Sequence, residues 1–485
     1  MQKTRNNGPR FAAAALCVGE DRMANRSIIA PTPPMGWSSY DCYGGRATEA
    51  DVRANVDYQA EHLLEFGWEY VVIDVAWYAE YSAPRPAYAI GSLNMDEYGR
   101  LVPSPTLYPS SVGGKGFGPL ADYIHDRGQK LGIHIMRGIP KIAVERNTPI
   151  LGSALRAADI ADRNNLCPWW EHMYGVDPSK PGAREYYDSI AGLYAEWGVD
   201  FIKADDMSCP CHEGEIKLLS EAIDRCGREI VLSLSPGPTS LADVDHIKPY
   251  ANAWRVSADL WDCWPDIERS FGYAEQWSSH RSPGRWPDLD ILPLGRLEIR
   301  PGEDSPEHIE RWTRLTRDEQ QTAMTLWLIS RSMLMIGGNL PDLDEWTLSL
   351  LTNPETLALA KRSHSNRQLH RTAGQVAWTA CDDSGSHYLA LFNLTDRPAV
   401  MRASLNEMGL SGGFAVRDLW RREDMGVVDE VVEVVVAGHG VRLMGIGTAD
   451  GNSSSARTST NSERAQRQHP ELRRRVRPVL HEHSC

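Results

Sequence analysis

One pattern of apolar and polar positions recurs four times in the first half of the chain. In each copy an amphipathic helix ends at a glycine or just before one, two or three polar residues follow, and an apolar run begins. Glycine relieves backbone strain at the C′ position of a helix, and a continuous apolar run is typical of a parallel strand buried on both faces. Four successive helix-to-strand units therefore predict a parallel α/β fold. The copies span residues 62–74, 123–136, 193–205 and 221–235.

The segment before the first copy carries a helix start. Thr48 and Asp51 resemble a capping box, in which two side chains satisfy the free N–H groups of the first helical turn. Apolar residues then recur at the spacing that gives a helix one buried face. These residues are Val52, Val56, Ala60 and Leu63.

Further apolar runs complete a ring of strands. Residues 35–38 precede the first copy, and residues 253–257, 289–294 and 333–337 follow the last. With the four strands of the repeated units they make eight, the number in a (β/α)8 TIM barrel. We therefore expect an α/β fold with a catalytic barrel over residues 31–368, and an open, doubly wound sheet is the alternative.

The pattern changes near residue 370. Residues 375–393 read as a hairpin with a glycine-containing turn, and 414–420, 427–436 and 441–446 read as further short strands. We expect a small C-terminal antiparallel β-sandwich over residues 369–447. The N-terminal residues 1–30 are irregular, and the Ser/Asn/Arg-rich tail, 448–485, has the composition of a disordered segment.

Composition restricts the classes of partner. The formal net charge is −14, which argues against a nucleic acid or an anionic membrane surface as the partner. No apolar run is long enough to span a bilayer. The chain has 16 tryptophans against 7 phenylalanines. The flat apolar face of tryptophan suits a sugar ring, although a single tryptophan is more often part of the core.

The cysteines and the N-terminus leave two questions open. Nine irregularly spaced cysteines argue against a disulfide framework. Cys209, Cys211 and His212 resemble part of a zinc site, but no second ligand pair stands at a suitable spacing, so we expect no metal and no cofactor.

A short apolar stretch at 11–18 follows basic residues, so residues 1–22 read either as a weak signal peptide or as a start assigned too early.

Polar residues gather where the predicted strands end. In a parallel barrel these ends form the active-site face. Cleavage of a glycosidic bond needs one ionised carboxylate and one protonated partner, and carboxylates close to cations acquire such different pKa values. Each residue alone is more readily a salt bridge or a helix cap; together they indicate a site. The strand-end residues are Asp74, His134, Arg137, Lys203, Asp205, Ser235, Arg255, Asp259 and Asp290.

Several motifs resemble glycoside hydrolase family 27, the α-galactosidase and α-N-acetylgalactosaminidase family of clan D. The resemblance runs from about residue 33 to 446. Its motifs are highly specific together, although each alone is weak. They are PPMGW at 33–37, GRLVP at 99–103, LADYIHDRGQKLGI at 120–133, WGVDFIKAD at 197–205, the Arg255-to-Asp259 segment and PGRWPDLD at 283–290.

The resemblance implies a role for each candidate residue. Asp205 is the expected nucleophile and Asp259 the expected general acid/base, with carboxyl groups about 5–5.5 Å apart and retention of the anomeric configuration. The remaining roles concern the sugar: Asp74 and Lys203 near the C4 hydroxyl, Asp74 also near C6, Arg255 and Ser235 near the C2 substituent, Trp37 as a wall, and His134 and Asp290 lining the subsite.

The sequence also departs from the family pattern. The family has two adjacent aspartates after strand two, where this chain has Asp74 and Val75, and it usually has Tyr where this chain has His134. Loss of the second acid weakens the case for a contact with the C6 hydroxyl. Two family cysteines are replaced by Ala76 and Met207, so two disulfides cannot form as usual. This favours a reducing, cytoplasmic compartment, with secretion as the alternative.

The leading hypothesis is a retaining, exo-acting glycosidase that removes terminal α-linked galactose. A β-L-arabinopyranosidase is the alternative within the family, because this sugar is galactose without C6; an isomaltose-releasing activity also occurs there. A non-catalytic sugar-binding barrel and a metal-dependent hydrolase using His134 are hypotheses from other classes. In the leading hypothesis the partner is a carbohydrate, and neither nucleic acid nor membrane is expected.

Overall fold

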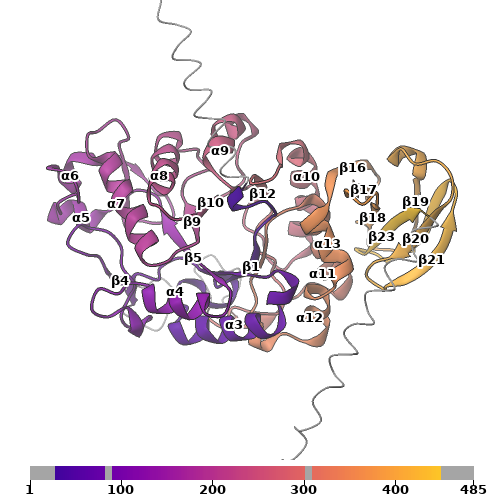
Figure 1. The fold of residues 1–485 in the computed structure, drawn as a ribbon, viewed down its shortest axis with the longest axis horizontal. Helices are drawn as coiled ribbons and strands as arrows, with labels where there is room; N and C mark the ends of the chain where they lie inside the picture. Colours follow the sequence, from indigo (N-terminus) through magenta and orange to yellow (C-terminus); the bar gives the residue numbers. More distant parts are fainter. Residues whose placement is uncertain (1–27, 82–89, 301–308, 449–485) are drawn as a thin grey trace, which may run out of the picture.

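The computed structural model describes residues 28–81, 90–300 and 309–448. It consists of a helix-covered parallel barrel and an antiparallel β-domain beside it (Figure 1). This architecture confirms the predicted TIM barrel followed by a β-sandwich. The predicted N-terminal segment and C-terminal tail lie almost entirely outside the described residues.

Eight parallel strands form the barrel in the order β12-β11-β10-β9-β5-β2-β1-β15. Within the described residues the end strands β12 and β15 do not pair with each other. Four residues after β12, Leu292 forms a parallel bridge with Ile336 of β15, in which Leu292 donates to the Met335 carbonyl and accepts from the Gly337 N–H. The sheet therefore closes through a seam one residue wide. In chain order the strands are β1 (Met35–Ser38), β2 (Tyr70–Ile73), β5 (Lys130–Met136), β9 (Phe201–Asp205), β10 (Val231–Leu234), β11 (Ala253–Arg255), β12 (Trp286–Asp288) and β15 (Leu334–Ile336).

The prediction for the seventh strand is wrong. We expected residues 289–294, but the strand is β12, Trp286–Asp288, and Asp290 lies beyond its end. Trp286 donates its N–H to Asn252 and Asp288 accepts from Val256, so both residues direct their backbone groups toward β11. Pro287 faces the other way, where the ladder requires no N–H, and proline is therefore tolerated there.

Helices cover the outside of the barrel (Figure 1). The capping box at Thr48 and Asp51 is confirmed at the start of α3. The expected glycines Gly67, Gly128, Gly198 and Gly227 all have positive φ, between 75° and 95°. The larger helices are α3 (Glu49–His62), α4 (Gly118–His125), α7 (Ala183–Glu196), α8 (Glu213–Arg225), α9 (Val244–Tyr250), α10 (Trp264–Gln276), α11 (Arg317–Ser330), α12 (Glu345–Leu351) and α13 (Pro354–Arg362).

Short elements decorate the loops of the barrel. They are the helices α2 (Tyr40–Tyr43), α5 (Lys141–Arg146) and α6 (Ala157–Ile160), and the strands β3 (Ala79–Tyr81), β4 (Ile90–Leu93), β6 (Ile139–Pro140), β7 (Ala161–Leu166), β8 (Met173–Val176), β13 (Arg296–Leu297) and β14 (Arg311–Trp312).

Alternate residues of each strand point into the barrel or out toward the helices. Tyr70, Phe201 and Val231 belong to one apolar cluster inside the barrel, whereas Val71 and Ile202 belong to the cluster shared with the helices. Asp74 lies four residues after the inward-facing Tyr70, and Asp205 lies four residues after the inward-facing Phe201. Asp74 and Asp205 therefore face the axis at the mouth.

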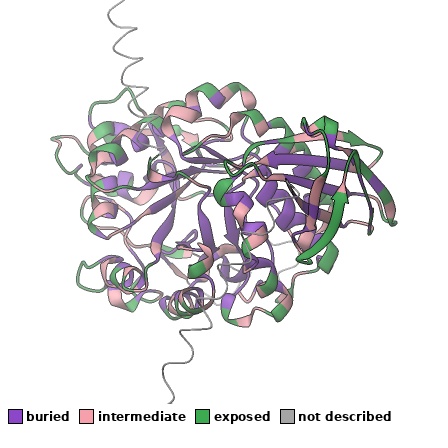
Figure 2. Cartoon of the chain, turned by 45° about the vertical axis from the view of Figure 1, so that its right-hand side comes forward, coloured by how far each residue is buried: buried purple, intermediate pink, exposed green. Residues whose placement is uncertain are grey.

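The C-terminal domain contains a six-stranded and a two-stranded antiparallel sheet (Figure 2). The predicted strand 427–436 is wrong, because a turn at 429–430 divides it into two strands, and β16 and β19 were not predicted. The expected boundary after residue 368 falls inside β16. The strands are β16 (His364–Thr372), β17 (Gln375–Cys381), β18 (His387–Asn393), β19 (Ala399–Ser404), β20 (Phe414–Asp418), β21 (Glu423–Val428), β22 (Val431–Val436) and β23 (Val441–Thr448).

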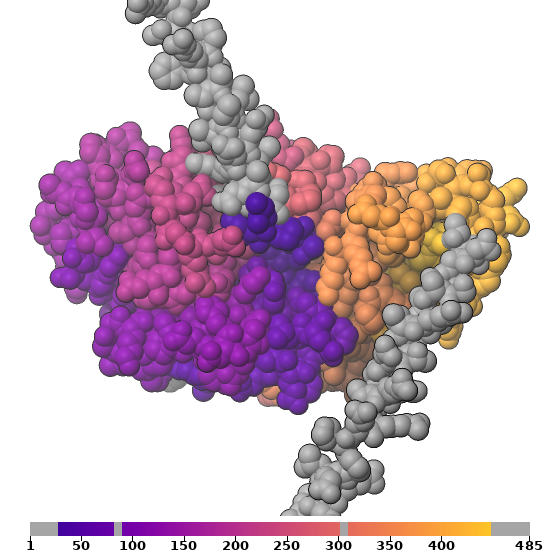
Figure 3. Space-filling model, viewed as in Figure 1, coloured from indigo at the N-terminus to yellow at the C-terminus, as the bar shows by residue number. Residues whose placement is uncertain are grey.

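The C-terminal domain packs against one side of the barrel (Figure 3). His439 stacks on Trp264 of α10, with ring centroids 3.9 Å apart. The His439 ring also lies 2.7 Å from Glu319 of α11, and Thr322 donates a hydrogen bond to the His439 carbonyl. Stacking and polar contacts thus fix the two domains to each other.

We predict that Gly36→Ala destabilises the protein by about 1–3 kcal/mol, the usual cost of overpacking. A Cβ atom at Gly36 would lie 2.1 Å from the Tyr70 carbonyl oxygen of the neighbouring strand. Thermal unfolding of the variant measures the loss.

The matched control for this prediction is Gly192→Ala. Gly192 is exposed on α7, and a Cβ there meets nothing within 4 Å. Alanine in a helix interior is expected to stabilise by up to about 1 kcal/mol. Equal unfolding temperatures for the two variants would contradict the prediction.

Candidate active site

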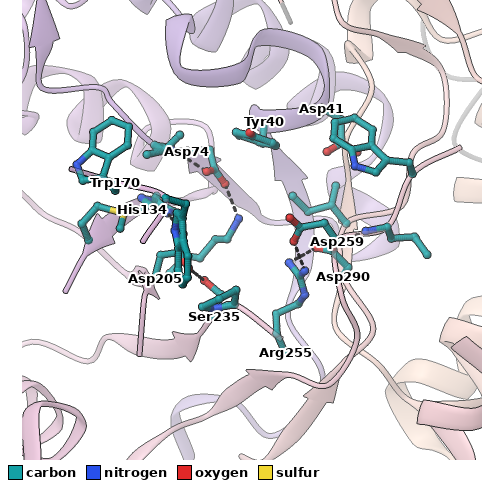
Figure 4. A pocket seen from close by; sticks show the side chains of 18 residues that line it. Tyr40, Asp41, Asp74, His134, Trp170, Asp205, Ser235, Arg255, Asp259 and Asp290 are labelled. Carbon is teal, nitrogen blue, oxygen red and sulfur yellow. Dashed lines mark hydrogen bonds and ion pairs between the residues drawn. The ribbon is translucent and has the colours of Figure 1, made fainter. Parts of the chain in front are cut away.

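The strand ends surround one cavity of about 380 Å³ (Figure 4). Figure 4 shows His134 and Asp205 on one side of the cavity and Arg255, Asp259 and Asp290 on the other. The structure therefore brings together eight of the nine residues predicted to bind substrate or act in catalysis. They are Asp74, His134, Lys203, Asp205, Ser235, Arg255, Asp259 and Asp290.

Trp37 is the exception, and its prediction as a wall of the sugar site is wrong. Its ring is fully buried and belongs to the cluster between the strands and the helices. The indole N–H donates to the Gly338 carbonyl at 2.9 Å. Trp37 lies one position before the inward-facing Ser38, so the alternation of the strand turns the indole away from the barrel axis.

Lys203 and Asp74 form the first ion pair of the cavity. Lys203 Nζ lies 2.8 Å from Asp74 Oδ2, and Ser38 donates a second, longer hydrogen bond to the same oxygen. The Val75 N–H donates to Asp74 Oδ1. Burial opposes ionisation of Asp74, but the charges of Lys203 and His134 and the hydrogen bonds from Lys203 and the Val75 N–H together outweigh it and lower the pKa of this carboxyl. The site thus presents a fixed cation and anion side by side.

Asp205 ends β9 and accepts hydrogen bonds on both oxygens. Ser235 Oγ donates at 3.1 Å and the Asp206 N–H at 2.8 Å to Oδ1, while His134 Nε2 lies 3.3 Å from Oδ2. Burial raises the pKa of Asp205, but the hydrogen bond and charge of His134 and the charge of Lys203 have the larger combined effect. The pKa of Asp205 is therefore lowered to about 2. Asp205 is therefore a carboxylate at neutral pH.

Arg255 joins two acids on the opposite side. Its guanidinium donates to Asp290 Oδ1 at 2.6 Å and also to Asp259 Oδ1. The Asp259 side chain is 56% exposed, whereas that of Asp205 is 19% exposed. Burial, together with the charge of Asp259, raises the pKa of Asp290 despite the opposing charge of Arg255. One side of the cavity therefore holds a deep anion and the other an accessible acid.

The prediction missed most of the aromatic and apolar lining. Tyr40 follows the end of β1, and a search confined to strand residues passes over it. The tryptophans stand on loops, where their only sequence signal is the high tryptophan content. The missed lining residues are Tyr40, Asp41, Met136, Trp169, Trp170, Pro236, Leu260, Trp261 and Ile291.

Arg137 lies behind the cavity. It donates to Asp206 at 2.9 Å and to Glu215 at 2.6 Å, and Tyr187 donates to the same Glu215. Asp206 has a φ of 57°, a left-handed conformation that is rare outside glycine. This buried network supports the turn that follows Asp205.

Asp41 lines the cavity with a carboxyl group that forms no ion pair with any residue in the described part of the chain. Its Oδ2 atom is buried and has no hydrogen-bond partner within the described ranges. Burial, followed by the charges of Asp290 and Asp74, raises the pKa of Asp41 well above its usual value, against the pull of Lys203. Asp41 is thus a carboxyl group that is hard to ionise.

Neither a metal site nor a disulfide is formed by the residues that the structure describes. Seven cysteines in these ranges are free thiols, Cys209 and Cys211 among them. No group of three or more His, Cys, Asp or Glu side chains in the described part is arranged to hold a metal ion. Across residues 28–81, 90–300 and 309–448, no helix has the length and apolarity of a membrane span.

Comparison with known families identifies both domains. Residues 175–362 match the model of the alpha galactosidase A family, and residues 372–446 match that of the alpha galactosidase C-terminal beta sandwich domain. An alpha-galactosidase from Cyamopsis tetragonoloba is 24% identical over 445 residues, which cover 90% of either chain.

Solved structures give a closer likeness. A family 27 β-L-arabinopyranosidase from Geobacillus stearothermophilus, solved as a variant in complex with arabinose, is 47% identical with a TM-score of 0.85. The match covers 87% of this chain and 99% of that one. Alpha-galactosidase I from Mortierella vinacea, at 21% identity and a TM-score of 0.67, shares the fold.

We predict that Asp41→Asn makes stability less dependent on pH. Because the folded pKa of Asp41 is raised, its contribution is fully present below the unfolded pKa of about 3.9 and is lost as pH rises toward the folded pKa. Asparagine cannot ionise, so the melting temperature of the variant relative to the wild type should increase from about pH 4 upward.

The control is Asp429→Asn, because Asp429 is exposed in the bend between β21 and β22. Its melting temperature should follow that of the wild type at every pH. If the melting temperature of Asp41→Asn also follows that of the wild type at every pH, the pH dependence of stability does not arise from ionisation of buried Asp41.

Proposed function

This chain belongs to glycoside hydrolase family 27 and is a glycosidase, and we propose that it removes terminal β-L-arabinopyranosyl units with retention of configuration. The observation that carries the choice of sugar is Val75, which lines the cavity directly beside the Asp74–Lys203 pair. Family membership bears out the resemblance in the sequence and leaves the non-catalytic barrel without support.

The proposed reaction is a double displacement. Asp205, ionised because its pKa is about 2, attacks the anomeric carbon, and the bond to the leaving oxygen breaks while Asp259 donates a proton to that oxygen. Water then attacks the glycosyl–Asp205 ester, and Asp259 takes the proton of the water. Two inversions give net retention.

Charged partners position the sugar in this proposal. Asp74 and Lys203 offer an acceptor and a donor 2.8 Å apart, which suits neighbouring ring hydroxyls. Arg255 is held by Asp290 and Asp259, so its guanidinium remains fixed beside the acid/base. His134 and Ser235 hold the Asp205 carboxylate in place while it reacts.

Val75 favours the pentose over the hexose. β-L-Arabinopyranose shares the ring hydroxyls of α-galactose but lacks the hydroxymethyl group at C5. A hydroxyl buried against Val75 loses its hydrogen bonds to water without replacement, which costs about 1–3 kcal/mol. The likeness to the Geobacillus β-L-arabinopyranosidase supports the same sugar.

The second candidate substrate is a terminal α-galactoside. It is supported by the match to the alpha galactosidase A model and by the Asp74–Lys203 pair, which suits the hydroxyls common to both sugars. Aryl β-L-arabinopyranoside, α-galactoside, α-N-acetylgalactosaminide and α-glucoside, compared by kcat/KM, separate these candidates.

We predict that Asp205→Gly lowers kcat by at least about a thousandfold, since the nucleophile is lost. Added azide should restore turnover and yield a glycosyl azide of inverted configuration, because azide occupies the space of the missing carboxylate. Proton NMR of the product reports the anomer. Substantial turnover in a folded Asp205→Asn protein would contradict the nucleophile assignment.

We further predict that Val75→Asp shifts the kcat/KM ratio toward the α-galactoside by about tenfold or more, since the carboxylate can accept from the C6 hydroxyl. Val75→Ile is the matched control, because it keeps the surface apolar and should retain the preference for the pentoside. An unchanged ratio in a folded Val75→Asp protein would count against the proposed sugar.

A further inference from the structure

Three tryptophans line the cavity. Trp169 and Trp170 lie in the loop between β7 and β8, and Trp261 lies between β11 and α10, two residues after Asp259. Trp169 is 46% exposed although it lines the cavity. A partly exposed indole in the wall of a cavity offers a flat apolar face to a ligand that binds there.

The chain beside Trp169 and Trp261 is anchored. Trp170, the neighbour of Trp169, is buried and packs edge-on against Tyr78 and His172, with ring centroids 6.3 and 5.3 Å away. The backbone N–H of Trp261 donates to Asp266 Oδ2 at 2.9 Å, at the start of α10. The backbone that carries the two rings is therefore fixed before a ligand binds, which lowers the entropy cost of ordering this part of the site.

The proposed mechanism defines which part of a substrate reaches these rings. The sugar that reacts must lie next to Asp205, the more buried carboxyl group, and the leaving oxygen must lie next to Asp259, the more exposed one. The group attached to that oxygen therefore extends toward the more exposed part of the cavity, whose lining includes Trp169, 46% exposed, and Trp261, two residues after Asp259.

We propose that Trp169 and Trp261 form a subsite for the leaving group, and that this group is a second sugar ring. The inference rests on the proposed function, because it takes its direction from the roles of Asp205 and Asp259. The C–H face of a pyranose packs on an indole, and neither ring supplies a charge that would select an ionic leaving group. The substrate class is then an oligosaccharide with the removed sugar at its non-reducing end.

The experiment compares three substrates that share one glycone: the glycosyl fluoride, the p-nitrophenyl glycoside and a disaccharide. A fluoride leaving group has no ring and cannot reach the subsite. Trp169→Ala is expected to lower kcat/KM for the disaccharide about 5- to 10-fold more than for the fluoride, the size of an aromatic contact. The p-nitrophenyl glycoside distinguishes a sugar-specific subsite from one that accepts any flat ring.

The matched control is Trp312→Ala. The Trp312 side chain is 48% exposed on β14 and does not line the cavity. Its removal should leave kcat/KM unchanged for all three substrates, which separates a local effect from the loss of any exposed indole.

Each outcome decides the inference. A larger loss for the disaccharide than for both other substrates supports a sugar subsite. Equal losses for disaccharide and aryl glycoside overturn the assignment of a sugar, because the site then accepts any flat ring. Equal losses for disaccharide and fluoride, no loss, or a loss confined to the aryl glycoside overturns the subsite itself. The series is made with both β-L-arabinopyranosyl and α-galactosyl glycones, so an error in the proposed sugar appears as inactivity of one whole series, independent of the Trp169 comparison.

Discussion

Two buried cations, Lys203 and Arg255, hold the acidic mouth of the barrel together. Carboxylates removed from water require compensation, and each cation is shared with neighbouring acids. Burial, followed by the charges of neighbouring acids, raises the pKa values of Asp290 and Asp41, whereas His134 and Lys203 lower that of Asp205 to about 2 despite its burial. Asp205, the proposed nucleophile, is therefore ionised beside acids that are harder to ionise.

The polar half of this site was predictable because polar residues interrupt apolar strands. The clearest cases are charged residues at or near the ends of otherwise apolar runs, namely Asp74, Lys203 and Asp205. Trp37 was misplaced because its role came from the family resemblance, and the four residues Met35–Ser38 are too few to show which alternate side chains face the axis. The seventh strand was predicted too far along the chain because a proline such as Pro287 usually argues against a strand. In the structure Pro287 occupies a position where the pairing with β11 needs no N–H.

Loops set a second limit on prediction. Trp169 and Trp261 stand on irregular segments without periodicity, so their place at the cavity depends on long-range packing alone. The same holds for Arg137, which the sequence places at a strand end and the structure turns toward Asp206 and Glu215. The barrel therefore supplies a common chemical core, and the loop residues adapt it to a particular substrate.

The narrow closure of the barrel between Leu292 and β15 lies next to Asp290, one of the acids in the cavity wall. Asp290 lies just before Leu292, with a φ of 94°, and is held by the Trp327 indole, by Asp288 and by Arg255. Such a conformation costs about 1–3 kcal/mol and persists only while its neighbours impose it. The backbone strain that orients the Asp290 carboxyl group therefore lies next to the narrow closure of the barrel. The conformation of this part of the cavity wall depends on the hydrogen bond from Trp327, and so on the packing of helix α11.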